Sequence, residues 1–384
     1  MKSSATLQHT SQVGVRDSNI ELYRILSMLL IIAHHYVVNS GLTASNGVIY
    51  SNILSLRSQF LLFWGAFGKI GINCFVLITG YFMCRSNISL KKYVKLLFEL
   101  MFYRVIINTI FWVTGYVPFT FKALFYTLLP IQSIAQNFGG TYLMFFLCIP
   151  FLNVLVHNMN ELQHLRLVLL CFFIYILMGS LPIFDVTMNY VSWFIVLYFI
   201  ASYIRLYPKK IYEKTVFWGI AAGSCILLCL MSVTVCSWLY TKINKNVVYY
   251  FVADSNKFLA VLTGLSTFLF FKNIKIKPNK LINTISSTTF GILLIHAHSD
   301  AMRRWLWKDI CNNVGVYHAA WMPLHAVGCV VAIFAICSLI DLLRIRFIEK
   351  PFFVFWDKHY PEWLQKFKTM EAKLLNKLKI GELE

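Results

Sequence analysis

Charged residues are scarce in this 384-residue chain: only 13% of its residues are Asp, Glu, Lys or Arg, and only 16 are acidic. Soluble domains are about 25% charged and about 45–50% apolar, whereas 58% of this chain is hydrophobic. In water, such a chain would expose large apolar patches and aggregate. Its 33 Phe, 20 Tyr and 10 Trp residues exclude a disordered polyelectrolyte despite a net charge of +19. The composition predicts a protein surrounded mostly by lipid.

The motifs of several common enzyme and metal sites are also missing. The sequence has no Cys-x-x-Cys pair, so zinc-ribbon and thioredoxin chemistry lack support. It has no glycine-rich phosphate loop, no His-Glu-x-x-His and no Gly-x-Ser-x-Gly. Nucleotide hydrolysis and the usual serine or zinc hydrolysis are therefore not indicated. Most of the ten cysteines lie in apolar runs, where they are expected to pack as small hydrophobic side chains.

Ten apolar runs are long enough to cross a bilayer, which takes about 20 helical residues for a hydrocarbon core of about 30 Å. The predicted spans are 20–38, 59–82, 94–117, 140–157, 165–181, 188–206, 216–240, 256–272, 284–300 and 321–343. Lys69 interrupts the second span, Glu99 and Arg104 the third, and Pro150 the fourth. No other segment is polar enough to form a soluble domain, and no internal repeat is evident.

The basic residues provide an independent test of this topology. An even number of spans places both termini on one side of the membrane. On that side lie 25 of the 35 Lys and Arg residues, with 8 on the other. By the positive-inside rule, both termini are expected in the cytoplasm. The basic excess is thus explained by topology, and no nucleic-acid partner is expected.

The expected organisation is a polar cytoplasmic N-terminus (1–17), a ten-helix membrane domain (18–350) and a basic amphipathic tail (351–384). The tail repeats large apolar residues at three- and four-residue spacing between lysines: Trp363, Phe367, Met370, Leu374 and Leu378. This pattern is typical of a helix lying on the anionic inner leaflet, with a frayed, solvated tail as the alternative. A cleaved signal peptide is not expected, because His34 and His35 would interrupt its apolar core.

The first span contains the richest set of ionisable residues at bilayer depth, where such groups are costly and often functional. Ser18-Asn19-Ile20-Glu21 has the pattern of a capping box that starts a helix at about residue 19. Arg24 and His35 lie within about 20° of one helix face and about 16 Å apart along it. A guanidinium can hold phosphate or carboxylate, and an imidazole can take a proton from a hydroxyl. A buried polar pair that only bonds neighbouring helices is the alternative.

Residues Arg24 to His35 resemble the first helix of acyltransferase family 3, whose motif is a basic residue, ten intervening residues and a histidine. Other segments similar in style to the family are Ile72–Phe82, Trp193–Tyr198, Phe290–His296 and Ile348–Pro351. The resemblance therefore extends over nearly the whole chain. The family's ten-helix core with cytoplasmic termini agrees with the predicted topology.

The resemblance implies transfer of an acyl group, usually acetyl from acetyl-CoA, to a sugar hydroxyl at a bacterial inner membrane. The implied acceptor is an envelope or capsular polysaccharide or its lipid-linked precursor, and polysaccharide-biosynthesis proteins are possible partners. His35 would be the catalytic base and Arg24 a donor-side or structural partner. Acetyl-CoA would be a co-substrate, with no tightly bound cofactor. Some members carry a fused hydrolase-like domain; none is recognised here, so the chain is expected to act alone or with a separate partner.

Further polar residues are candidates for substrate binding, with plain hydrogen bonding between helices as the favoured alternative for His296 and Asp300. On the donor side these are Lys92, Lys95 and Arg104, and on the acceptor side His34, His296 and Asp300. The two lysines match a family element that usually has arginines, so they keep the charge but lose the planar guanidinium. His296 and Asp300 are expected to share a helix face, with His298 pointing elsewhere. No third ligand is evident beside them, so no metal site is expected.

The remaining ionisable residues in or near the spans have simpler interpretations. Lys69 and Arg104 would bind an anionic donor or extend to the membrane surface. Asp341 is expected to pair with Arg344 or Arg346. The helix that contains them is expected to end at Pro351.

Two other classes of function stay open at this point. A transporter or flippase for a polar solute or lipid-linked glycan would use intramembrane His, Asp and Arg residues as its pathway, but no matching halves are found. A membrane scaffold for polysaccharide synthesis would explain the spans but not the spacing of Arg24 and His35. The prediction is therefore an all-α integral membrane O-acyltransferase without a soluble domain.

Overall fold

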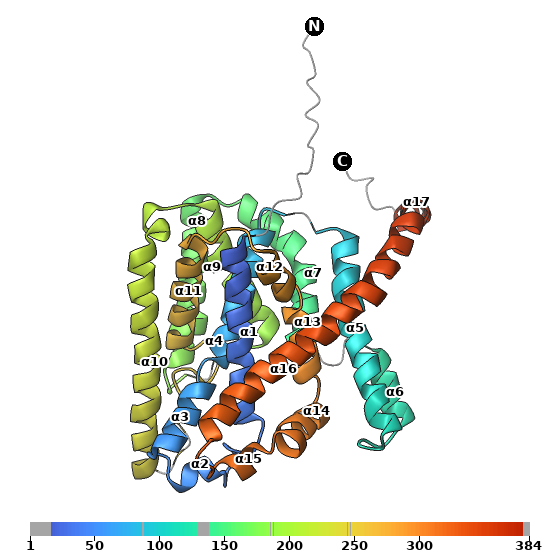
Figure 1. The fold of residues 1–384 in the computed structure, drawn as a ribbon. Helices are drawn as coiled ribbons and strands as arrows, with labels where there is room; N and C mark the ends of the chain where they lie inside the picture. The colour runs from blue at the N-terminus through green and yellow to red at the C-terminus, as the bar shows by residue number, and fades with distance from the viewer. Residues whose placement is uncertain are drawn as a thin grey trace.

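A computed structural model of the chain describes residues 17–86, 88–129, 138–184, 186, 188–243, 245 and 247–378. All regular secondary structure in these residues is helical (Figure 1). Helices satisfy their backbone hydrogen bonds internally, as lipid requires. The all-α prediction is therefore confirmed. The expected polar N-terminus lies outside the described residues, apart from Asp17.

Seven helices among the described residues are long and apolar enough to cross a membrane. They are α1 (Ser18–Val38), α3–α4 (Leu56–Gly65 and Gly68–Met83), α5 (Leu90–Val113), α7 (Phe138–His157), α8 with its π-helical continuation η2 (Glu161–Cys171 and Phe172–Met178), α10 (Thr215–Ile243), and α16 (Met322–Arg344) with the helix that follows it. Two shorter apolar helices are α9 (Tyr190–Leu206) and α11 (Phe258–Asn273). These helices correspond to nine of the predicted spans, and they make the chain a multi-pass membrane protein.

The predicted span 284–300 is not one continuous helix. It is divided between α12 (Lys280–Ser286) and α13 (Thr289–His296), and the chain turns before α14 (Asp300–Arg304). The prediction of a single helix was therefore wrong at this place. The total of ten membrane spans and the cytoplasmic location of both termini stay predictions.

Helix α1 occupies a central position in the bundle, where it contacts α3, α4, α11, α12, α13 and α16. Figure 1 shows α10 at one edge of the bundle and α5 with α6 (Phe121–Leu128) at the other. Helix α9 is the most deeply enclosed, because almost every residue from Trp193 to Ile204 is buried. The remaining short elements are α2 (Val48–Ser51), η3 (Lys210–Glu213), η4 (Trp305–Ile310) and α15 (Asn313–Val316).

The start of α1 differs from the predicted capping box. Asp17 is the N-cap residue, and no side chain caps the helix. The Ser18 hydroxyl instead donates to Oδ1 of Asn283 at 2.9 Å, while Glu21 accepts a hydrogen bond from Ser286. The capping box was therefore wrong, because both of its side chains join α1 to α12.

Pro351 does not end the helix that precedes it. The chain runs from α16 through the π-helical segment η5 (Ile345–Glu349) directly into α17 (Lys350–Leu378), which extends beyond the bundle (Figure 1). Proline lacks an N–H and disturbs a regular α-helix, and the change of hydrogen-bond register in η5 accommodates it. The expected helix end was wrong, and the boundary at 350 falls within a continuous helix. Of the apolar tail residues, Trp363 and Met370 are exposed, and the side chains of Phe367, Leu374 and Leu378 lie outside the described part.

Candidate functional site

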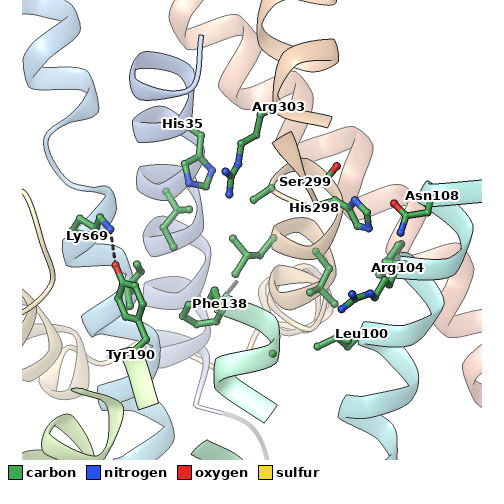
Figure 2. A pocket seen from close by; sticks show the side chains of 17 residues that line it. His35, Lys69, Leu100, Arg104, Asn108, Phe138, Tyr190, His298, Ser299 and Arg303 are labelled. Atoms are coloured by element: carbon green, nitrogen blue, oxygen red, sulfur yellow. Dashed lines mark hydrogen bonds between the residues drawn. The ribbon is translucent and has the colours of Figure 1, made fainter. Parts of the chain in front are cut away.

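A cavity of about 330 Å³ lies inside the bundle between α1, α4, α5, α7, α9 and the segment from α13 to α14. Its polar lining residues are His35, Lys69, Tyr103, Arg104, Asn108, Tyr190, His298, Ser299 and Arg303, most of which are labelled in Figure 2. No Asp or Glu occurs among the described residues that line it. The His35 cavity, as we call this space and its lining, is therefore polar and rich in cations.

The imidazole of His35 is held by a second imidazole from α13. Nδ1 of His35 lies 3.0 Å from Nε2 of His296, and Nδ1 of His296 lies 2.6 Å from the carbonyl oxygen of Ile292. A carbonyl only accepts hydrogen bonds, so Nδ1 of His296 donates, and in a neutral ring its Nε2 must accept. Nδ1 of His35 is therefore the donor, and the lone pair of His35 lies on Nε2. In this tautomer His35 can accept a proton.

The break between α3 and α4 fixes how α1 faces the cavity. The ring Nδ1 of His34 lies 2.6 Å from the carbonyl oxygen of Gly65, at the end of α3. Helix α4 then starts at Gly68, where an added Cβ would lie 2.2 Å from Cβ of His34. Only glycine allows this close approach. His34 thus packs against α3 and α4, outside the cavity lining, while the next residue, His35, faces the cavity.

Lys69 is held on the opposite wall by two partners. Its Nζ donates to the Tyr190 hydroxyl at 2.6 Å (Figure 2) and lies 3.7 Å from Oδ1 of Asp254. The Tyr190 hydroxyl in turn donates to Asp254 at 3.1 Å. The interruption that Lys69 makes in the second predicted span is therefore a polar contact inside the protein.

The third wall is formed by one face of α5. Arg104 donates from Nη2 to the carbonyl oxygen of Tyr126 at 2.6 Å, and Asn108 donates to the Thr127 hydroxyl at 2.8 Å. Both partners belong to α6, which thus fastens this polar face of α5. Arg303 completes the lining from α14, where its Nη1 donates to Oδ1 of Asp300 at 2.8 Å.

The family model of acyltransferase family 3, which describes an acyltransferase domain, matches residues 17–342 of the chain. This range includes every residue that lines the His35 cavity. The chain belongs to acyltransferase family 3. No curated protein and no solved structure matches it. The resemblance of the first helix is thus confirmed at the level of the family, and the protein is a membrane acyltransferase.

Several residues predicted for the site of this acyltransferase lie outside the cavity lining. Arg24 forms an ion pair with Glu21, at a distance of 3.8 Å, three helical turns from His35. Lys92 donates to the Ser86 hydroxyl at 2.9 Å. Lys95 lies 2.6 Å from a carboxylate oxygen of Glu349. Of the donor-side candidates, only Arg104 lines the cavity.

The predicted geometry of His296, His298 and Asp300 was wrong. Helix α13 ends at His296, so Asp300 does not share its face, and the Asp300 side chain is 91% exposed. His298, which was expected to point elsewhere, lines the cavity. The turn after α13 rotates these side chains away from helical spacing. Among the described residues, no group of three His, Cys, Asp or Glu side chains could hold a metal ion.

A second ionic site of the acyltransferase lies between α5 and the α16–α17 junction. Arg344 pairs with Glu99 at 3.1 Å, with Asp341 at 2.7 Å and with Glu349 at 2.7 Å. Lys95 pairs with the other oxygen of Glu349. The predicted pairing of Asp341 with Arg344 is confirmed. We call these five residues the Arg344 cluster.

Tyr103 connects the two sites. Its hydroxyl donates to Oδ1 of Asp341 at 2.6 Å, and its side chain lines the His35 cavity. The sequence analysis did not identify Tyr103, Asn108, Tyr190, Ser299 or Arg303 as site residues. Arg303 is next to an exposed arginine, Arg304, and no sequence signal distinguishes the two.

Proposed function

We propose that this acyltransferase is an O-acyltransferase of a bacterial inner membrane. It transfers an acetyl or other short acyl group from acyl-CoA to a sugar hydroxyl. The acceptor is an envelope or capsular polysaccharide or its lipid-linked precursor. The observation that carries the proposal is His35, whose hydrogen bond to His296 leaves Nε2 as a proton acceptor in a polar cavity.

The reaction follows from this arrangement. Nε2 of His35 removes the proton of the acceptor hydroxyl while the hydroxyl oxygen attacks the thioester carbonyl. A C–O bond forms, the C–S bond breaks, and the CoA thiolate takes up the proton from His35. Lys69, in the same cavity, is available to stabilise negative charge on the carbonyl oxygen. The chemistry needs no cofactor beyond acyl-CoA as co-substrate.

In this proposal the two substrates occupy different depths of the bundle. Acyl-CoA approaches from the side that is expected to be cytoplasmic and that carries most of the Lys and Arg residues. On this path it passes Arg24. The long pantetheine arm of CoA suits the separation of Arg24 and His35, which is about 16 Å along one helix face. The acceptor hydroxyl meets the thioester at His35.

The test is acyl transfer by the purified full chain in nanodiscs. Acetyl-CoA is supplied with and without surface polysaccharide extracted from the organism that encodes the protein (host polysaccharide), and the release of free CoA thiol is measured. The expected result is CoA release that depends on the polysaccharide and yields acetylated glycan. Uptake of a glycan into vesicles without CoA release would instead identify a transporter. If the protein showed neither acyl transfer nor transport but did associate with polysaccharide-synthesis proteins, it would be identified as a scaffold.

A further inference from the structure

The lining of the His35 cavity contains three cations, Lys69, Arg104 and Arg303, and no carboxylate among its described residues. Gathering cations around one space inside the bundle is unfavourable unless anions or water compensate them, and the side chains of Lys69 and Arg303 are 27% and 36% exposed. Lys69 has Asp254 outside the lining. The cavity itself therefore has a marked preference for a negatively charged occupant.

Arg303 is the cation whose hydrogen bonding is most incomplete. Its Nη1 pairs with Asp300, but that carboxylate is 91% exposed, so water and salt weaken the pairing. Nε of Arg303 is buried and has no hydrogen-bond partner in the described part of the chain. A buried donor without an acceptor is costly, and a ligand oxygen would remove that cost.

His298 offers a second incomplete group in the same lining. Its Nδ1 is buried and also lacks a hydrogen-bond partner among the described residues. Arg303 is close enough to His35 to act on it electrostatically, and Arg104 is close enough to act on His298. Figure 2 shows Arg303 directed toward His35, and His298 directed toward Asn108 and Arg104 on the other side of Ser299. The unpartnered Nε donor of Arg303 therefore belongs to a side chain beside His35, where a reacting substrate would be bound.

We infer that Arg303 forms an anion-binding site beside His35 that holds a carboxylate or a phosphate of a substrate. A guanidinium binds either group through two parallel hydrogen bonds, which fixes orientation as well as position. The inference rests on the proposed function. The proposed function places the phosphates of CoA near Arg24, about 16 Å from His35, so the anion beside His35 belongs to the acceptor, as a uronic-acid carboxylate or a sugar phosphate.

The experiment compares Arg303→Gln with the adjacent Arg304→Gln, whose parent residue is exposed and outside the cavity lining. The KM values for acetyl-CoA and for host polysaccharide are measured in nanodiscs for both variants and for Arg303→Lys. We expect Arg303→Gln to raise the KM of one substrate at least tenfold, with partial recovery in Arg303→Lys and no change in Arg304→Gln. A rise for the polysaccharide assigns the anion to the acceptor. A rise for acetyl-CoA instead, without a rise for acetyl-pantetheine, would place the CoA phosphates at Arg303 and contradict both the assignment to the acceptor and the proposed position of CoA near Arg24.

A binding measurement separates this site from the proposed reaction. Thermal unfolding of the purified full chain is followed with pyrophosphate, with glucuronate and with glucose, at constant ionic strength. We expect stabilisation by at least one anion and not by glucose, lost in Arg303→Gln and retained in Arg304→Gln. Stabilisation without any acyl transfer by the parent protein would reject the proposed function and keep the anion site. Equal KM values and equal anion effects in Arg303→Gln and the parent would overturn the inference.

Discussion

The His35 cavity and the Arg344 cluster are two ionic sites in one helix bundle, and they differ in how their buried charges are compensated. In the cluster, three carboxylates surround a single guanidinium that is only 2% exposed. In the cavity, cations line an open space without a described carboxylate. Buried charges that pair with each other fix the positions of helices, whereas cations that line a space without a described carboxylate are suited to an anionic ligand. The comparison is consistent with a structural role for the first site and with the proposed acyl transfer at the second.

The largest expected effect comes from removing the proton acceptor in the cavity. His35→Ala should lower kcat by about 10²- to 10⁴-fold, the range that general bases contribute. Polysaccharide-dependent CoA release measures it, and thermal unfolding in detergent checks that the variant is folded. His157→Ala, at an exposed histidine on α7, is the control and should keep full activity. Normal acyl transfer by a folded His35→Ala protein would remove the cavity from the mechanism.

The Arg344 cluster should respond in stability. Arg344→Leu leaves three buried carboxylates without their shared cation, and it should destabilise the fold by about 3–5 kcal/mol. The midpoint of thermal unfolding and the monodisperse fraction after purification measure this loss. Adding Glu99→Gln and Asp341→Asn should recover much of the stability, because fewer charges then lack a partner. An unchanged midpoint in Arg344→Leu would break the distinction between the two sites.

His296 should have an intermediate effect on rate, accompanied by some loss of stability in the alanine variant because the side chain is fully buried. His296→Ala removes the acceptor that fixes the tautomer of His35, and kcat should fall on the order of 10²-fold. His296→Gln, whose side-chain oxygen can accept the same hydrogen bond, should recover part of the rate. The pH profile of kcat should broaden or shift in His296→Ala. Equal rates in the alanine and glutamine variants would show that His296 only fills space.

Tyr103 lies between the two sites and should show the smallest effect. Tyr103→Phe removes one hydrogen bond to Asp341, which keeps its bond to Arg344, so stability should fall by about 1.5 kcal/mol. The phenol has no role in the proposed proton transfer, so kcat should change less than about threefold. Chemical or thermal unfolding and CoA release measure the two quantities. A loss of rate larger than the loss of stability explains would place Tyr103 among the residues that act on substrate.

The sequence predicted the parts of this protein that depend on local pattern. Nine of the predicted spans correspond to apolar helices, because length and hydropathy suffice to recognise a membrane helix. The sequence also predicted that Arg24 and His35 share one helix face and match a family motif, since both depend on spacing along a single helix. Pairing of Asp341 with Arg344 follows from the same helical spacing.

The sequence did not predict features that arise where the helical pattern stops. The break at Gly68 depends on its contact with His34, which comes from another helix. The turn after His296 removes Asp300 from the predicted face and brings His298 into the cavity. The side chains of Ser18 and Glu21 form hydrogen bonds with α12 and do not cap their own helix, so the local capping pattern was misleading.

The sequence alone determined that this chain is a membrane protein. Apolar content and the distribution of basic residues can be counted segment by segment, without knowledge of how the segments pack. It also determined the family, and it identified His35 as the leading candidate for the site. Only the tertiary structure decided which charges are paired and which line a cavity. Arg303 and Arg304 are adjacent and chemically identical, yet one faces the cavity and the other is exposed. The physical reason is that burial and hydrogen-bond partners belong to the packing of several helices, and no single helix encodes them.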